Sequence, residues 1–267
     1  MALLLRRLHP GIAAHDDAGA EFHDHEIRLS SQNGEDGLLL HILSAVGVGD
    51  RRIVELGIED GRECLARMLI LHFGWSGLLL DCEAANVADA RRFFHVNSAV
   101  APDRLRIVEC FVTAENIDGV LADNGITGEI DLLAIDIDGN DYWVWKAIEA
   151  VRPRVVVIEY NASLGPDEAL ITVYDPQFDR KTKHSSGWYH GASLAALADL
   201  GRRRGYALVG SDSSGINAFF VRRELLGDAL TEVTPRQAWR PHRTRTERAT
   251  PGQQLALLKT LPLVKDS

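Results

Sequence analysis

Short apolar runs that end on acidic or amide side chains alternate along this chain with segments whose apolar residues recur at helical spacing. Apolar runs of this kind are typical of strands buried on both faces of a parallel sheet. The sequence therefore predicts an α/β fold in which strands and helices alternate. The predicted strands of this part are Ile53–Gly57, Trp75–Asp81, Arg104–Phe111, Leu132–Ile135 and Val155–Ile158.

The later part of the chain departs from this alternation. A helix is predicted over Tyr189–Arg204, and two further apolar runs, Tyr206–Gly210 and Asn217–Arg222, flank the turn-like segment Ser211–Gly215. Two such runs joined by a short polar turn favour an antiparallel hairpin. Together the patterns predict one mostly parallel seven-stranded sheet with an antiparallel C-terminal hairpin.

The stretch Asp131–Pro166 holds the densest group of candidate functional residues. Asp136 and Asp138 follow one predicted strand, and Glu159 and Asn161 follow the next. Ligands of open α/β sheets bind outside the carboxyl ends of the strands. We therefore expect these four side chains to share one crevice at that edge of the sheet.

The same four residues, Asp136, Asp138, Glu159 and Asn161, offer hard oxygen ligands of the type that suits Mg²⁺. One interpretation is thus a magnesium site. The other is that the acids after the first of these strands form only a turn and a helix N-cap, which needs fewer carboxylates. The sequence leaves both interpretations open.

The first predicted strand runs into a turn with Gly57 and Gly61, and Arg62–Phe73 then has a helical pattern. A strand, a glycine turn and a helix form the cofactor corner of doubly wound sheets, because glycine lets the backbone approach the ligand. The dinucleotide pattern GxGxxG is absent, and Glu55 and Glu59 make the turn acidic. Such a turn favours a cationic or zwitterionic ligand over a pyrophosphate.

Further polar residues lie where the same ligand would extend. Asp81 ends the second predicted strand, where an acid can accept the hydroxyls of a ribose. Glu115 and Asn116 follow the third predicted strand. Gln32 precedes the apolar helix predicted at Leu38–Val46; capping explains much of that polar stretch, and Gln32 is a candidate ligand contact.

The long connection Ala162–Trp188 has no clear periodicity. Connections of this length are usually functional or disordered, and the aromatic and histidine content of this one favours substrate binding. His184 within it and His190 just after it are candidate general bases, because a neutral imidazole matches the operating pH. A surface or hydrogen-bonding role is the alternative for either histidine.

Composition narrows the classes of function. A formal net charge of -9 and a pI near 5.6 argue against a general nucleic-acid binder. No apolar run reaches the roughly 18–20 residues of a membrane span, and Met1–Leu8 lacks the apolar length of a secretory signal. The three cysteines show no CxxC spacing and fit a reducing compartment, so we expect a cytoplasmic protein without a nucleic-acid or membrane partner.

The chain is expected to form one domain with additions at both ends. Residues 1–29 are interpreted as an N-terminal extension, residues 30–228 as the domain that carries the sheet, and residues 229–267 as an arginine-rich tail. We interpret the tail as a solvated or subunit-contacting segment, which leaves a homo-oligomer open. Its arginines are Arg236, Arg240, Arg243, Arg245 and Arg248.

Five motifs together carry a family resemblance: SQNGEDG, VELGIEDGRE, GWSGLLLD, LLAIDIDGNDYWVW and VVVIEYNASLGP. Over roughly Ser30–Arg222 the chain resembles S-adenosylmethionine (SAM)-dependent methyltransferases of the FkbM-like group. The resemblance implies the class I methyltransferase, Rossmann-like fold. It also implies contacts to the methionine part of SAM by Glu55, Gly57 and Gly61, to the ribose by Asp81, to the surroundings of the adenine by Glu115 and Asn116, and to the methionine part or a metal by Asp136.

The chemistry of the residues agrees with this resemblance. Sulfonium methyl transfer is an in-line displacement, so the enzyme must mainly align the donor and deprotonate the acceptor. We predict SAM-dependent methyl transfer to a small molecule, at a hydroxyl of a sugar or natural-product intermediate, with Mg²⁺ as an optional cofactor. The alternatives are an enzyme that uses SAM for intramolecular alkylation and a degenerate SAM-binding regulatory protein. A nicotinamide dehydrogenase shares the sheet but needs a phosphate loop that this chain lacks.

Overall fold

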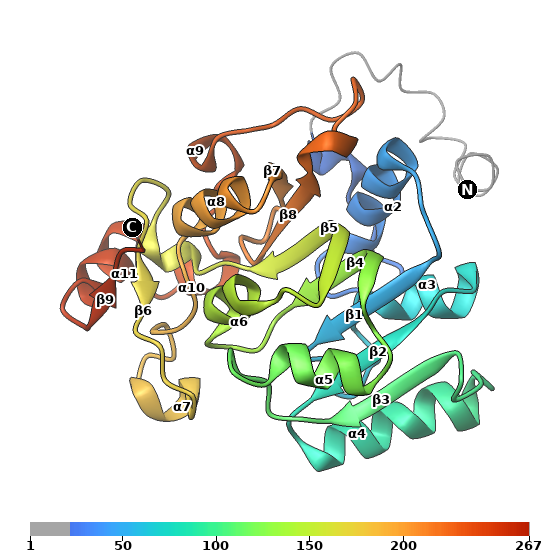
Figure 1. Ribbon diagram of the computed structural model, residues 1–267. Coiled ribbons are helices and arrows are strands. Elements are labelled where there is room, and N and C mark those ends of the chain that lie inside the picture. Colours follow the sequence, from blue (N-terminus) through green and yellow to red (C-terminus); the bar gives the residue numbers. More distant parts are fainter. Residues whose placement is uncertain (1–21, 267) are drawn as a thin grey trace.

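The computed structural model describes residues 22–266, and its centre is a seven-stranded sheet of order β3-β2-β1-β4-β5-β8-β7 (Figure 1). Strands β1 to β5 run parallel, and β8 runs antiparallel to both β5 and β7. The predicted α/β fold and its antiparallel C-terminal hairpin are confirmed. The strands of this sheet are β1 (Arg52–Leu56), β2 (Ser76–Asp81), β3 (Leu105–Glu109), β4 (Gly128–Ile135), β5 (Val151–Glu159), β7 (Tyr206–Ser211) and β8 (Asn217–Arg222).

Helices cover both faces of the sheet, because successive strand residues point to opposite sides. Leu133 packs in a core with α5, α6 and α8, whereas Leu132 packs in a second core with α2, α3 and α4. The helices of this part are η2 (Phe22–His25), α2 (Glu35–Val46), α3 (Ala66–Phe73), α4 (Ala84–Arg91), the π-helical turn η3 (Arg92–Asn97), α5 (Ile117–Asp123), α6 (Asp141–Ala147) and α8 (Leu194–Arg203). Within the described residues, no helix has the length and apolar character needed to cross a membrane.

Two helices start later than the sequence pattern predicts. Helix α3 begins at Ala66, because the carboxylate of Glu55 accepts the N–H groups of Leu65 (2.8 Å) and Ala66 (2.7 Å) and so fixes its first turn. Helix α8 begins after Ser193, whose hydroxyl oxygen caps it. The residues just before α8, among them His190, are therefore free to pass along the ends of the strands.

Two segments outside the alternation of strands and helices meet beside those strand ends (Figure 1). Strand β6 belongs to the connection after β5, strand β9 to the C-terminal segment, and the two pair antiparallel. The connection forms η4 (Ala162–Leu164), β6 (Ile171–Thr172) and α7 (Arg180–Lys183). The C-terminal segment forms η5 (Arg223–Leu225), α9 (Pro235–Ala238), α10 (Arg243–Thr246), α11 (Pro251–Leu258) and β9 (Leu263–Val264).

The C-terminal segment is docked onto the sheet domain. Asp266 accepts hydrogen bonds from Tyr142 (2.6 Å), Lys146 (2.7 Å) and Arg203 (2.7 Å). Arg245 is only 5% exposed. The interpretation of the arginine-rich tail as a solvated or subunit-contacting segment is therefore wrong for Arg245, which points into its own chain.

Candidate active site

Carboxylates converge where β4 and β5 end. Asp136 and Asp141 follow β4, Glu159 ends β5, and one oxygen of each lies within 4.8 Å of the others. The parallel register explains this convergence, since Ile135 pairs with Ile158 and the chain leaves both strands at one level. The strand ends thus bring Glu159 close to Asp136 and Asp141, from which it is separated in sequence by the whole of β5.

The loop after β4 is shaped by its own acids. Asp141 accepts the N–H groups of Ile137 (2.8 Å) and Gly139 (2.9 Å), which is the turn-forming role that the sequence left open. Asp138 adopts a left-handed conformation, with φ 56°, and forms an ion pair with Arg180 of α7. Asp138 is thereby engaged by a cation of the long connection.

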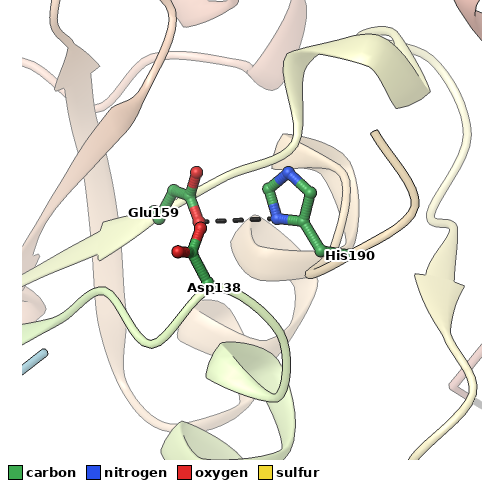
Figure 2. A group of neighbouring side chains, drawn as sticks. All are labelled: Asp138, Glu159 and His190. Atoms are coloured by element: carbon green, nitrogen blue, oxygen red, sulfur yellow. Dashed lines mark ion pairs between the residues drawn. The ribbon is translucent and has the colours of Figure 1, made fainter. Parts of the chain in front are cut away.

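Glu159 and His190 face each other at the centre of the cluster (Figure 2). Oε2 of Glu159 lies 3.5 Å from Nδ1 of His190, and both atoms are buried without a hydrogen-bond partner among the described residues. The carboxylate of Asp138 approaches the same glutamate (Figure 2). The other ring nitrogen, Nε2, lies 2.9 Å from the guanidinium of Arg245.

Asn161 is fully engaged within the protein. Its Oδ1 accepts from Arg245 (3.0 Å) and from the N–H of Ser163 (3.1 Å), and its Nδ2 donates to the carbonyls of Trp188 (2.7 Å) and His190 (2.8 Å). Both lone pairs of the amide oxygen are therefore used. The prediction of Asn161 as a metal ligand is wrong; this side chain ties β5 to the residues before α8.

Asp136 differs from these neighbours. Its side chain is open to solvent, and its carboxylate receives no hydrogen bond from residues 22–266. One of its oxygens lies within 4.8 Å of those of Asp141 and Glu159, and desolvation at the strand ends and then the negative charge of Glu159 raise its pKa well above the usual range. The same two causes raise the pKa of Asp141 to about 7. A raised pKa makes a carboxylate a better proton acceptor.

Glu159 stays ionised because of its cationic surroundings. Burial opposes its charge, but His190, Arg180 and Arg245 outweigh burial and lower the pKa of Glu159 to about 2. Burial also lowers the pKa of His190, against the pull of Glu159. Arg180 and Arg245 add their positive charges to the surroundings of the Glu159 carboxylate.

The two candidate histidines differ in access. His190 is fully buried with Nε2 against Arg245, so it cannot serve as the predicted general base in this arrangement. His184 is half-buried after α7, and its Nδ1 lies 2.8 Å from the hydroxyl of Ser186. A base role for His184 stays a prediction.

The glycine turn after β1 lies against the end of β4. Gly57 has φ 81°, and a Cβ at this position would lie 1.7 Å from the carbonyl oxygen of Asp136. Gly61 has φ 75°, and a Cβ there would lie 2.8 Å from the ring of Phe94. Glycine is therefore required at both positions. The turn lies directly beside the backbone of Asp136 and so next to the carboxylate cluster.

The predicted cofactor acids Glu55 and Asp81 hold the backbone of this corner. Asp81 accepts the N–H groups of Glu59 (2.8 Å) and Glu83 (2.9 Å) and an amide N–H of Asn86 (3.1 Å), which uses three of roughly four acceptor positions. Glu55 caps α3, and burial raises its pKa to about 7. Contacts of either residue with SAM stay predictions.

The loop after β3 is joined to the long connection. The hydroxyl of Tyr174 donates to Glu115 (2.5 Å) and accepts the N–H of Ala114 (3.3 Å). Asn116 uses its amide to hold this loop, accepting from Thr113 N–H (2.8 Å). Gln32 is exposed in the loop ahead of α2.

The model of the methyltransferase FkbM domain matches residues 47–206, more than half of the chain. The chain belongs to the FkbM methyltransferase family. The expectation of a SAM-dependent methyltransferase of this group is thereby confirmed. No curated protein sequence matches the chain.

Solved structures resemble this FkbM methyltransferase only distantly. An O-methyltransferase from Bacillus cereus in complex with SAH has 17% sequence identity and a TM-score of 0.45, covering 81% of this chain and 95% of that chain. The N-terminal domain of EvdMO1 with SAH bound has 16% identity and a TM-score of 0.44, covering 72% and 80%. A putative O-methyltransferase from Klebsiella pneumoniae has 14% identity and a TM-score of 0.44, covering 82% and 94%. The fold assignment therefore rests on the strand order and the family match.

Several of the acidic and amide groups that could bind magnesium are already engaged by protein groups in this FkbM methyltransferase. Asp138 pairs with Arg180, Asp141 binds loop N–H groups, and Asn161 binds Arg245. The carboxylate of Asp136 and Oε2 of Glu159 have no hydrogen bond from residues 22–266 and could still bind a metal. Two carboxylates with water can suffice for Mg²⁺, but the guanidinium groups of Arg180 and Arg245 already supply positive charge beside this cluster. The predicted four-residue site therefore does not fit the structure.

Sequence reasoning missed the two arginines of the site. Arg180 follows Asp179, the N-cap of α7, which is a recognisable local signal for a short helix but says nothing about Asp138. Arg245 is one of five arginines in the tail, and no local pattern separates it from the exposed Arg243 and Arg248. Only the packing of the C-terminal segment distinguishes Arg245.

Proposed function

We propose that this FkbM methyltransferase transfers the methyl group of SAM to a hydroxyl of a small molecule, a sugar or natural-product intermediate, and that Asp136 takes the hydroxyl proton. The bond between the sulfonium sulfur and the methyl carbon breaks as the oxygen–methyl bond forms, and SAH leaves with a neutral sulfur. The observation that carries the proposal is the carboxylate of Asp136, open to solvent and without a hydrogen bond from residues 22–266.

The position of Asp136 supports this role. Its backbone N–H donates to the carbonyl of Leu56 (3.0 Å), and its carbonyl oxygen lies against Gly57 in the cofactor turn. A base fixed to the cofactor turn keeps a constant distance to the donor. In-line transfer depends on such alignment, since an error of about 1 Å can reduce the rate about 100-fold.

A cavity of about 410 Å³ in the long connection supports a small-molecule acceptor. Phe178 lines it and also packs on Gly139 in the loop after β4, where a Cβ would lie 2.4 Å from the ring. Aromatic walls with an adjacent charged pair suit the flat face and hydroxyls of a ring-shaped acceptor. The lining includes Tyr174, Asp175, Phe178, Lys183, Tyr189 and Leu261.

The test compares Asp136→Asn with Asp138→Asn. The second variant carries the same change two residues further along the same loop, on a carboxylate that is already paired with Arg180. We expect Asp136→Asn to bind SAM as the wild type does in calorimetry and to lose at least about 100-fold in kcat, the usual contribution of a positioned base. Asp138→Asn should lose less than about 10-fold. Equal turnover in Asp136→Asn and the wild type would show that Asp136 is not the general base.

The wild-type protein tests the broader proposal. Screening acceptors by mass spectrometry should give a product about 14 Da heavier than the acceptor, because one methyl group replaces one hydrogen. SAM binding without any turnover would favour a regulatory SAM-binding protein, and release of methylthioadenosine instead of SAH would favour intramolecular alkylation. Magnesium assistance stays a prediction, tested by repeating the assay after EDTA treatment and with added Mg²⁺.

A further inference from the structure

Arg245 is the one arginine of the C-terminal helix α10 that is buried, and the proposed reaction does not yet use it. Its guanidinium donates to Nε2 of His190 (2.9 Å), to Oδ1 of Asn161 (3.0 Å) and to the hydroxyl of Ser163 (3.2 Å). All three partners are themselves buried. A charged side chain with this many buried partners is held in one position.

The contact with Arg245 decides which nitrogen of His190 carries the proton. A guanidinium has only donors, so Nε2 must accept and therefore carries no hydrogen. The neutral ring then holds its proton on Nδ1. That N–H faces Oε2 of Glu159 across 3.5 Å, and both buried atoms are otherwise without a hydrogen-bond partner among the described residues (Figure 2).

We propose that Arg245 is a positioning residue of the methyl-transfer site: it fixes His190 as the Nδ1–H tautomer, and His190 in turn orients the carboxylate of Glu159 beside Asp136. This proposal rests on the proposed function for its catalytic consequence. Because Arg245 and His190 are buried, the proposal gives them no direct contact with donor or acceptor. They act through Glu159, whose oxygen lies within 4.8 Å of one from Asp136.

The same guanidinium also fixes the edge of the long connection. Asn161, which accepts from Arg245, donates to the carbonyls of Trp188 and His190. One side chain from the C-terminal segment thus holds the end of β5 and the residues before α8 in a single network. Loss of Arg245 should disturb the orientation of Glu159 more than the cofactor turn, which Arg245 does not contact.

The first test reads the tautomer directly. In ¹⁵N-labelled protein, long-range proton–nitrogen correlations distinguish the two tautomers of each histidine, and His190→Gln identifies the signals of His190. We expect the Nδ1–H form in the wild type and in Arg245→Lys, which keeps a donor. Arg245→Met should shift His190 toward the Nε2–H form, whereas Arg243→Met, an exposed neighbour in the same helix, should leave it unchanged. An unchanged tautomer in Arg245→Met would overturn the proposal.

The second test measures the consequence for turnover. We expect Arg245→Met to lower kcat about 10- to 100-fold with KM for SAM within about twofold, because positioning and not cofactor binding is lost. Arg245→Lys should recover part of kcat. A tautomer shift in Arg245→Met with wild-type kcat would sink the positioning role while leaving the proposed function intact.

A second pair of variants covers the case in which Arg245→Met does not fold. In His190→Gln the side-chain oxygen can accept from Arg245 and the amide N–H can donate to Glu159, whereas His190→Leu can do neither. We expect kcat of His190→Gln to exceed that of His190→Leu at least about 10-fold, since an unpaired buried charge is costly. Equal values would contradict the proposal. Absence of methyl transfer in the wild type would count against the proposed function, and the tautomer would still decide the role of Arg245.

Discussion

Among the glycines of residues 22–266, Gly57 leaves the least room for a Cβ, which allows a quantitative test. An alanine Cβ would lie 1.7 Å from the carbonyl oxygen of Asp136, and real Cβ contacts begin near 3.0 Å, so the strand end must move by roughly 1.3 Å. The positive φ of 81° adds about 1–2 kcal/mol for any residue with a Cβ. We therefore expect Gly57→Ala to lose about 3 kcal/mol or more in the free energy of unfolding, beyond the ordinary range for one substitution.

The matched control is Gly74→Ala. Gly74 also has a positive φ, 69°, but a Cβ there meets nothing within 4 Å, so this variant isolates the backbone cost. Urea unfolding of both variants should separate the two contributions, and calorimetry should show SAM binding weakened at least about 10-fold in Gly57→Ala alone. Equal stability losses in the two variants, with wild-type SAM binding in both, would refute the close approach of the cofactor turn to Asp136.

Two further predictions concern the supports of the cofactor site. Because burial raises the folded-state pKa of Glu55 from 4.5 to about 7, its contribution to stability is full below pH 4.5 and is lost as the pH rises through 7. The stability advantage of the wild type over Glu55→Gln, measured by urea unfolding, should therefore shrink between pH 5 and about 8 by up to about 3 kcal/mol, and a constant difference would contradict the shift. Tyr174→Phe removes the hydroxyl that joins Glu115 and Ala114 to the long connection, so SAM binding should weaken about three- to tenfold in calorimetry; an unchanged Kd would show that this link does not support the cofactor loop.

The sequence was sufficient for the sheet and for the edge that carries the carboxylates. Apolar runs such as Leu132–Ile135 and Val155–Ile158 are local signals, and parallel pairing then places the residues that follow them at one level. The acids after β4 were placed by this argument alone. Even the competing interpretation of that loop as a turn proved right in part, because Asp141 binds loop N–H groups.

The partners of those carboxylates could not be predicted in the same way. Asn161 has the chemistry of a metal ligand, but its oxygen accepts from the nearby Ser163 N–H and from Arg245, which lies 84 positions later. His190 has the chemistry of a base, and the same arginine takes its Nε2. Similarly, the late start of α3 depends on Glu55 in the preceding strand. In each case a side chain is hydrogen-bonded to a residue that is distant in sequence, and no local pattern predicts that contact.

The residues that the family model matches and the residues that line the cavity of the long connection come only partly from the same segments. The family match covers residues 47–206, which contain the glycine turn, the strand-end acids and the long connection, but it ends before Arg245. The C-terminal segment beyond it pairs β9 with β6 and contributes Leu261 and Pro262 to the cavity of the long connection. The cavity that we propose for the acceptor is therefore lined by two segments that only the folded chain brings together. Family membership identifies the methyl donor, and the acceptor must be sought through the shape and charge of that joint surface.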